Sequence, residues 1–161
     1  MTTDQGGSET RTGRNETDEE RLDRKWDDLL QELRVMQTSA QLTAGFLLTL
    51  PFQTAFADLN KFQEGLYLGL VVLASLIIAL VMTPVAVHRH LSGEHVKERV
   101  VATGHRIVRT VVGALSLLIL GIVTLIFDVV IDRTIALVVA GCMGLILIGL
   151  LVVLPLRLTR D

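Results

Sequence analysis

Cysteine, proline and aromatic residues are scarce in this sequence, and the usual motifs of catalysis are missing. Its 161 residues include one cysteine and three prolines, and 4% of them are aromatic. The single cysteine, Cys142, excludes an intrachain disulfide, and its apolar run without a histidine is typical of a core residue. The sequence has no Gly-rich phosphate loop, no paired cysteines and no HExxH arrangement. We therefore expect no catalytic residue, no cofactor, no metal site and no enzymatic activity.

Charged residues are absent from four long stretches. No Asp, Glu, Lys or Arg occurs in residues 35–57, 65–87, 110–127 and 134–156, although 20% of the chain is charged. About 20 consecutive apolar residues cross a bilayer as an α-helix. This segregation of charge excludes a soluble enzyme, a nucleic-acid-binding protein and a disordered protein as descriptions of the whole chain. We predict membrane spans at about 35–57, 65–87, 107–127 and 134–156.

The N-terminal part of the chain divides into a polar tail and an amphipathic segment. Residues 1–17 have no large apolar side chain after Met1, which predicts a disordered cytoplasmic tail and leaves 18–161 as a four-span membrane domain. Thr17 and Glu20 fit a capping box. The apolar residues that follow are spaced by three or four, as on one helix face: Leu22, Trp26, Leu29, Leu33, Met36 and Ala40. This face predicts a helix that rests on the membrane or on its own bundle, or else a short coiled coil with a partner.

Basic residues are distributed very unevenly between the connections. Thirteen of the fifteen Lys and Arg residues lie in the N-terminal segment, in residues 88–109 or in the C-terminal tail, and the two short connections contain only Lys61 and Arg133. Cytoplasmic segments carry such an excess, so both termini are predicted to be cytoplasmic. The short connections 58–64 and 128–133 predict antiparallel helical hairpins. The sequence thus predicts an all-α fold, a four-helix transmembrane bundle of two antiparallel hairpins.

Residues 88–109 combine five basic residues with all four histidines. The spacings of the histidines fit no compact set of metal ligands: His88, His90, His95 and His105. We interpret this segment as an interfacial loop that contacts anionic lipid headgroups. The predicted partners are therefore the lipid bilayer, and a second copy of the chain or another membrane protein, but not nucleic acid.

Small residues in the fourth predicted span mark a helix-packing face. Ala136, Ala140 and Gly144 follow one another at steps of four, and small residues let helices approach closely in lipid. We interpret the three as helix-packing residues, either within one chain or between two chains.

The first predicted span contains a polar stripe. Arg34, Gln37 and Gln41 fall on one helix face. The two amides are either hydrogen-bond partners between helices or the lining of a small polar cavity. Pro51 is predicted to kink this helix and to free the carbonyl of Leu47, with Gln53 close enough to help satisfy it.

Thr83-Pro84, near the end of the second span, is predicted to terminate that helix. None of the charge-free runs contains an ionisable acidic or basic group, whereas proton-coupled transport relies on such groups within the membrane. This absence argues against an ion-driven transporter and favours a structural or regulatory membrane protein.

Several short motifs resemble a family of small four-span membrane proteins from actinobacteria. They are Glu32-Leu33-Arg34, Gln37-Thr38, Gln41, Gly45-Phe46-Leu47-Leu48 and Pro51-Phe52, with Pro84 and His88-Arg89 after the second span. The resemblance covers residues 25–155 and implies a multi-pass integral protein of a bacterial inner membrane. The activity of this family is unassigned, and some members carry an automatic sodium/proton antiporter label. A small cation/proton antiporter or channel subunit is therefore the alternative function.

Overall fold

The computed structural model of the protein describes residues 18–90 and 97–158. Within these ranges it describes all side chains except those of residues 18, 19, 22, 23, 85–90, 97–103, 105 and 158. Four long helices make up this part of the chain: α1 (Asp18–Thr49), α2 (Lys61–His90), α3 (Lys97–Val130) and α4 (Arg133–Ile148). The predicted tail, Thr17 of the predicted capping box and part of the predicted lipid-binding segment lie outside the described residues. The all-α prediction is confirmed.

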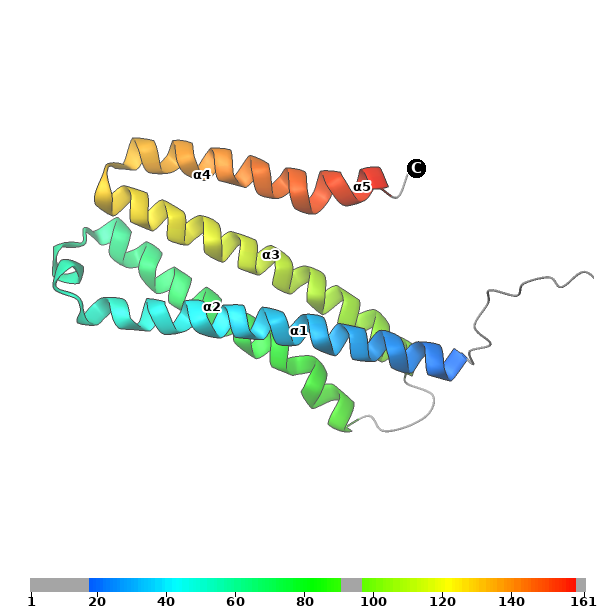
Figure 1. Ribbon diagram of the computed structural model, residues 1–161. Helices are drawn as coiled ribbons and strands as arrows, with labels where there is room; N and C mark the ends of the chain where they lie inside the picture. The colour runs from blue at the N-terminus through cyan, green and yellow to red at the C-terminus, as the bar shows by residue number, and fades with distance from the viewer. Residues whose placement is uncertain (1–17, 91–96, 159–161) are drawn as a thin grey trace, which may run out of the picture.

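Shorter elements complete the fold. Two 3₁₀ turns, η1 (Leu50–Phe52) and η2 (Thr54–Asp58), connect α1 to α2. A π-helical turn, η3 (Gly149–Val153), and a last α-helical turn, α5 (Leu154–Leu158), continue α4. Figure 1 shows that both short connections lie at the same end of the molecule, which we call the short-loop end.

Within the described residues, three helices are long and apolar enough to cross a membrane. These segments are Lys61–Pro84, Arg106–Val130 and Arg133–Arg157. They contain the third and fourth predicted spans and residues 65–84 of the second. The first predicted span differs from the structure, because α1 ends at Thr49 and residues 50–58 form the two 3₁₀ turns.

The apolar face of α1 packs inside the protein. Leu29, Leu33, Ala40 and Leu47 are buried, and α1 contacts both α2 and α3. Near its beginning, the contact depends on a glycine of α3, because a Cβ atom at Gly104 would lie 3.0 Å from Leu29 Cδ1. The amphipathic segment therefore rests on its own bundle, which was one of the predicted alternatives.

A second glycine of α3 brings this helix close to α2. A Cβ atom at Gly121 would collide with the side chain of Leu70, which is itself buried. Small residues at helix contacts permit this close approach in membrane proteins. The helices α1, α2 and α3 consequently form a packed three-helix unit around Ile77, Val111 and Leu118.

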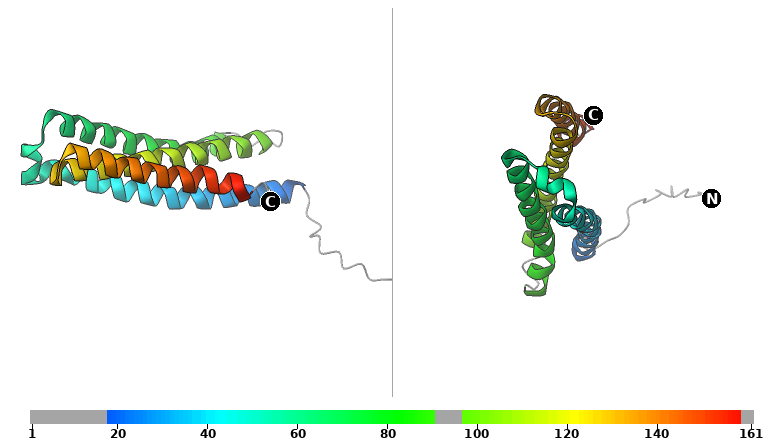
Figure 2. Two further views of the ribbon diagram at one scale, coloured as in Figure 1. Left: turned by 90° about the horizontal axis from the view of Figure 1, so that it is seen from above. Right: turned by 90° about the vertical axis from the view of Figure 1, so that its left-hand side faces the viewer.

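The fourth helix lies outside this unit. Within the described residues the backbone of α4 packs along α3 and along neither α1 nor α2, and η3 and α5 pack along no other long helix. Only at the start of α4 does a side chain, that of Arg133, reach Phe62 of α2. Figure 2 shows α4 standing away from α1 and α2 on the far side of α3. A closed four-helix bundle is therefore not confirmed. The helices form a three-helix bundle with one appended helix, and Cys142, predicted in a core, is exposed.

Two prolines behave differently from the predictions. Pro51 ends α1 rather than kinking it, since the chain passes into the 3₁₀ turn Leu50–Phe52. Pro84, predicted to end the second helix, lies inside α2, which continues to His90. Prolines are tolerated inside apolar helices. The backbone bond that Pro84 cannot make is the one to the Leu80 carbonyl, whereas the Thr83 hydroxyl donates to the neighbouring Ala79 carbonyl.

Candidate functional site

A buried pair of polar side chains joins α2 to α3 at the short-loop end. Gln63 is 7% exposed and Asp128 is 8% exposed, and apart from Tyr67 they are the buried hydrogen-bonding side chains of the described residues. The Gln63 amide nitrogen donates to Asp128 Oδ2 at 2.8 Å and to the Asp128 carbonyl at 3.2 Å. One amide group thus binds both the side chain and the backbone of the residue near the end of α3.

Arg133, the first residue of α4, completes this arrangement. Its Nε donates to Asp128 Oδ1 at 3.0 Å. Its guanidinium carbon lies 3.9 Å from the centre of the Phe62 ring, a cation–π geometry. We call Asn60, Phe62, Gln63, Asp128 and Arg133 the short-loop clasp, because together they tie α2, α3 and α4 to one another.

The helix termini hold the clasp residues in place. Asn60 Oδ1 accepts from the backbone N–H groups of Phe62 and Gln63, at 3.0 and 3.1 Å, while Gln63 Oε1 accepts from the Asn60 N–H at 2.9 Å. This is a reciprocal cap of the first turn of α2, a variant of the capping box. At the start of α4, Asp132 Oδ1 accepts from the Ile135 N–H. Both caps orient the side chains that meet at Asp128.

The clasp leaves no unpaired group in its interior. Both oxygens of the Asp128 carboxylate and both ends of the Gln63 amide have partners, and the described residues include no buried side-chain nitrogen or oxygen without a hydrogen bond. A buried charge is tolerated only when it is paired and hydrogen-bonded in this way. This geometry is typical of a structural role, since both Asp128 carboxylate oxygens and the Gln63 amide oxygen already accept hydrogen bonds from the protein.

A second buried hydrogen bond lies beside the clasp and concerns the end of α1. Pro51 has no N–H to donate to the carbonyl of Leu47, four residues earlier. The Tyr67 hydroxyl of α2 donates to this carbonyl at 3.0 Å. The acceptor was predicted from the sequence, but the donor was not: Tyr67 takes the role that was expected for Gln53.

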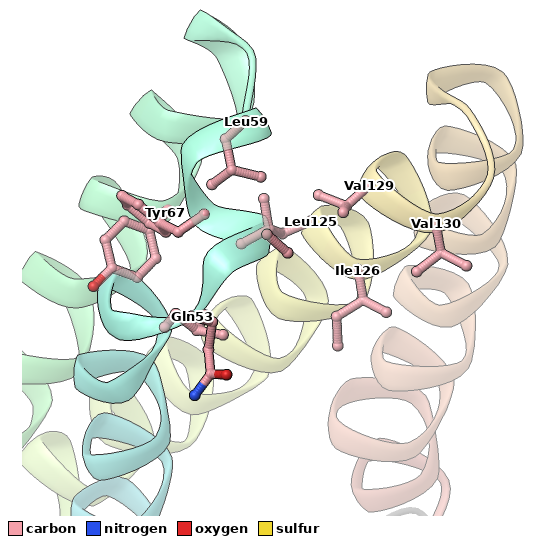
Figure 3. Close-up of a pocket in the computed structure, with 10 residues that line it drawn as sticks. Gln53, Leu59, Tyr67, Leu125, Ile126, Val129 and Val130 are labelled. Atoms are coloured by element: carbon pink, nitrogen blue, oxygen red, sulfur yellow. The ribbon is translucent and has the colours of Figure 1, made fainter.

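An apolar pocket lies between the 3₁₀ turns and α3. It has a volume of about 170 Å³, and Tyr67, Leu125 and Val129 are among the residues that line it (Figure 3). The Phe56 ring meets the Tyr67 ring edge-on at 5.0 Å. Gln53 lies at the edge of this pocket, and the other nine lining residues are apolar or aromatic. Apart from the Gln53 amide and the Tyr67 hydroxyl, which donates to the Leu47 carbonyl, these walls offer no polar side chain to an ion.

The structure does not gather the predicted polar stripe around a cavity. Arg34, Gln41 and Gln53 are exposed and Gln37 is half-buried. Of the four, only Gln53 borders the pocket. These side chains are spread along the outer surface of α1 and its following turn.

The predicted packing residues of α4 lie toward α3. Ala136 is fully buried, Ala140 and Gly144 are half-buried, and a Cβ atom at Gly144 would lie 3.9 Å from Leu120 of α3. No group of three His, Cys, Asp or Glu side chains within metal-binding reach occurs in the described part of the chain. The four histidine side chains lie outside that part.

Sequence reasoning missed Gln63 and Tyr67 and assigned no partner to Asp128. A local signal existed for Gln63, because Asn60 precedes it by three residues as in a capping box. No local signal points to its pairing with Asp128, which lies 65 residues further along the chain.

The fold and the short-loop clasp together define an all-α protein with helices of membrane-spanning length. Buried polar contacts join α2, α3 and α4 at one end. The chain belongs to the family described as "Family of unknown function (DUF6328)", whose pattern matches residues 15–155. No curated protein and no solved structure matches the chain.

Proposed function

We propose that this chain is an integral protein of a bacterial inner membrane that crosses the bilayer four times, with both termini in the cytoplasm. Its role is structural or regulatory and is exerted through contacts with lipid or with a membrane protein partner, without catalysis. The observation that carries this proposal is the complete pairing of the buried polar groups in the short-loop clasp.

The length over which α1 packs against α2 and α3 supports counting α1 as a membrane span in addition to α2, α3 and α4. Leu29 packs at Gly104 of α3, and the Leu47 carbonyl binds Tyr67 of α2. These two contacts are 18 residues apart on α1, or about 27 Å at 1.5 Å per residue. Glu32 and Arg34 lie within this stretch, so its charge-free part begins at residue 35, and the charge-free run continues through the 3₁₀ turns to residue 57. The hydrocarbon core of a bilayer is about 30 Å thick, and the packing of this run beside α2 and α3 supports its crossing the membrane with them.

The state of Asp128 favours a structural role over the antiporter alternative. Proton-coupled transporters use ionisable groups inside the membrane that bind and release their ligands. Among the described residues, Asp128 is the buried carboxylate, and Gln63 and Arg133 occupy both of its oxygens. A carboxylate held in this way stabilises the helix ends rather than exchanging protons with a substrate path.

Ion flux in proteoliposomes tests the functional class. The purified full chain is expected to support no sodium- or potassium-dependent proton flux, and Asp128→Asn is expected to lower thermal stability in detergent. The matched control is Asp132→Asn, which changes an exposed carboxylate four residues away. A robust cation-dependent proton flux that Asp128→Asn abolishes and Asp132→Asn preserves would overturn the proposal in favour of the antiporter.

Reporter fusions test the four spans. Fusions at residues 5 and 160 are expected to report cytoplasm, and a fusion at Asn60 is expected to report the opposite side. A cytoplasmic signal at Asn60 would contradict this topology.

A further inference from the structure

One face of α3 is covered along half of its length and open along the other half. Arg106, Arg109, Gly113, Leu117 and Leu120 follow one another at steps of three or four, so they share one helix face. Leu120 faces Gly144 of α4. On the side toward the beginning of α3, however, the first four of these residues are exposed, and nothing lies within 4 Å of a Cβ atom built on Gly113.

The uncovered part of this α3 face begins at the level where α4 passes into η3. Within the described residues α4 contacts α3, but η3 and α5 do not, and the residues from Leu150 to Arg157 are all exposed. Figure 1 shows the two helices diverging toward the end of the molecule opposite the short loops. We call the two facing surfaces the α3–α5 wedge: residues 106–117 of α3 and 149–157 of η3 and α5.

Charge and apolar surface are sharply divided within this wedge. Arg109 is the last charged residue before the charge-free run of α3, and Arg157 is the first after the charge-free run of α4. Because the two helices run antiparallel, both arginines border the same side of the membrane, with Arg106 one turn further out. Deeper in the wedge the exposed side chains are apolar, for example Leu117 and Leu151.

We infer that the α3–α5 wedge binds an anionic phospholipid of the cytoplasmic leaflet, with its phosphate at Arg106 and Arg109 and an acyl chain along Gly113 and Leu117. This inference rests on the proposed membrane-spanning function. It assigns the anionic-lipid contact predicted for residues 88–109 to Arg106 and Arg109 and adds a binding surface for an acyl chain. Arginine matches the phosphate group in charge and in hydrogen-bond geometry. The open space at Gly113 provides room for a hydrocarbon chain beside the helix.

Native mass spectrometry of the full chain in a mild detergent measures this binding, with dioleoylphosphatidylglycerol as the anionic probe and dioleoylphosphatidylcholine as the neutral one. Each basic residue near a membrane surface contributes about 1 kcal/mol toward anionic lipid. Arg106→Gln/Arg109→Gln is therefore expected to weaken phosphatidylglycerol binding about 30-fold, which corresponds to about 2 kcal/mol.

Arg34→Gln is the matched charge control. Arg34 follows Leu29 by five residues and Arg109 follows Gly104 by five, and Leu29 packs at Gly104, so the two arginines lie at similar depth on different helices. The control is expected to change binding less than threefold. General charge attraction would cost the single Arg34→Gln variant about 1 kcal/mol, or about fivefold. A loss of fivefold or more in Arg34→Gln would therefore overturn the site.

Gly113→Leu tests the acyl-chain part of the wedge without changing charge. It is expected to reduce phosphatidylglycerol binding at least fivefold, whereas Gly45→Leu, which also adds a side chain in open space, is expected to have no effect. Equal binding of the neutral lipid, or unchanged binding in both Gly113→Leu and the double arginine variant, refutes the inference. Resistance of the wild-type protein to carbonate extraction distinguishes these failures from a failure of the membrane proposal itself.

Discussion

The hydrogen bond from Tyr67 to the Leu47 carbonyl exists because Pro51 cannot supply a helical donor, and this makes a rescue experiment possible. Tyr67→Phe removes the hydroxyl but keeps the ring and its edge-on contact with Phe56. The Leu47 carbonyl then loses a partner at 3.0 Å in a buried position. Pro51→Ala restores a backbone N–H four residues after this carbonyl, where a helix would place its donor.

The expected cost follows from the burial of the bond. Tyr67 is 4% exposed, and leaving a buried acceptor without its donor costs about 1–3 kcal/mol. Interhelical hydrogen bonds in membranes lie at the lower end, at about 0.6–1.7 kcal/mol. We expect Tyr67→Phe to lower the free energy of unfolding by about 1–2 kcal/mol in the wild-type background. In the Pro51→Ala background we expect less than half of that loss.

Reversible unfolding in mixed detergent micelles measures all four members of this double-mutant cycle. A coupling free energy of at least about 0.5 kcal/mol, in the direction of rescue, is expected because the two groups act on the same carbonyl. If Tyr67→Phe costs the same in both backgrounds, the hydroxyl does not replace the missing donor and the reasoning is refuted.

Three other substitutions test packing and polar contacts in the same unfolding assay. Gln63→Leu is expected to cost about 2–3 kcal/mol, since it leaves an oxygen of the buried Asp128 carboxylate without its 2.8 Å partner; a cost below about 0.5 kcal/mol would refute a structural clasp. Gly121→Leu is expected to cost about 1–3 kcal/mol by overpacking against Leu70. Its control, Gly69→Leu, meets open space and is expected to be neutral. Equal effects of the two substitutions would contradict the close α2–α3 contact. Gln41→Leu is expected to change stability by less than about 0.5 kcal/mol because the side chain is exposed; a loss of 1 kcal/mol or more would indicate an interhelical role for its amide.

The positions of the helices could be predicted from the sequence because each depends on local information. Charge-free runs bounded by charged residues predict the second, third and fourth spans, and the segments Lys61–Pro84, Arg106–Val130 and Arg133–Arg157 contain most of each. The repeat of apolar residues at steps of three and four predicted the buried face of α1, in which Leu29, Leu33 and Ala40 are buried.

A polar contact could be predicted from the sequence only in part, where a residue close in the sequence identifies one of its two partners. The Leu47 carbonyl was identified because the proline that deprives it of a donor lies four residues away. Its actual donor, Tyr67, is 20 residues distant, and the Gln63–Asp128 pair spans 65 residues. Such pairs depend on the relative rotation of two helices, which periodicity within one helix does not determine.

The isolated position of α4 follows from the same physics that predicted its packing face. In a bilayer, the lipid tails are as apolar as leucine side chains, so helices associate mainly where small residues permit close contact. The small-residue stripe of α4 is Ala136, Ala140 and Gly144, and it lies toward α3, where a Cβ at Gly144 would approach Leu120. One such stripe provides contact with one neighbour, and the remaining surface of α4 gains little from leaving lipid. A helix with a single small-residue face is therefore expected to be appended to a bundle rather than enclosed in it, and the clasp at Arg133 fixes the end at which α4 remains attached.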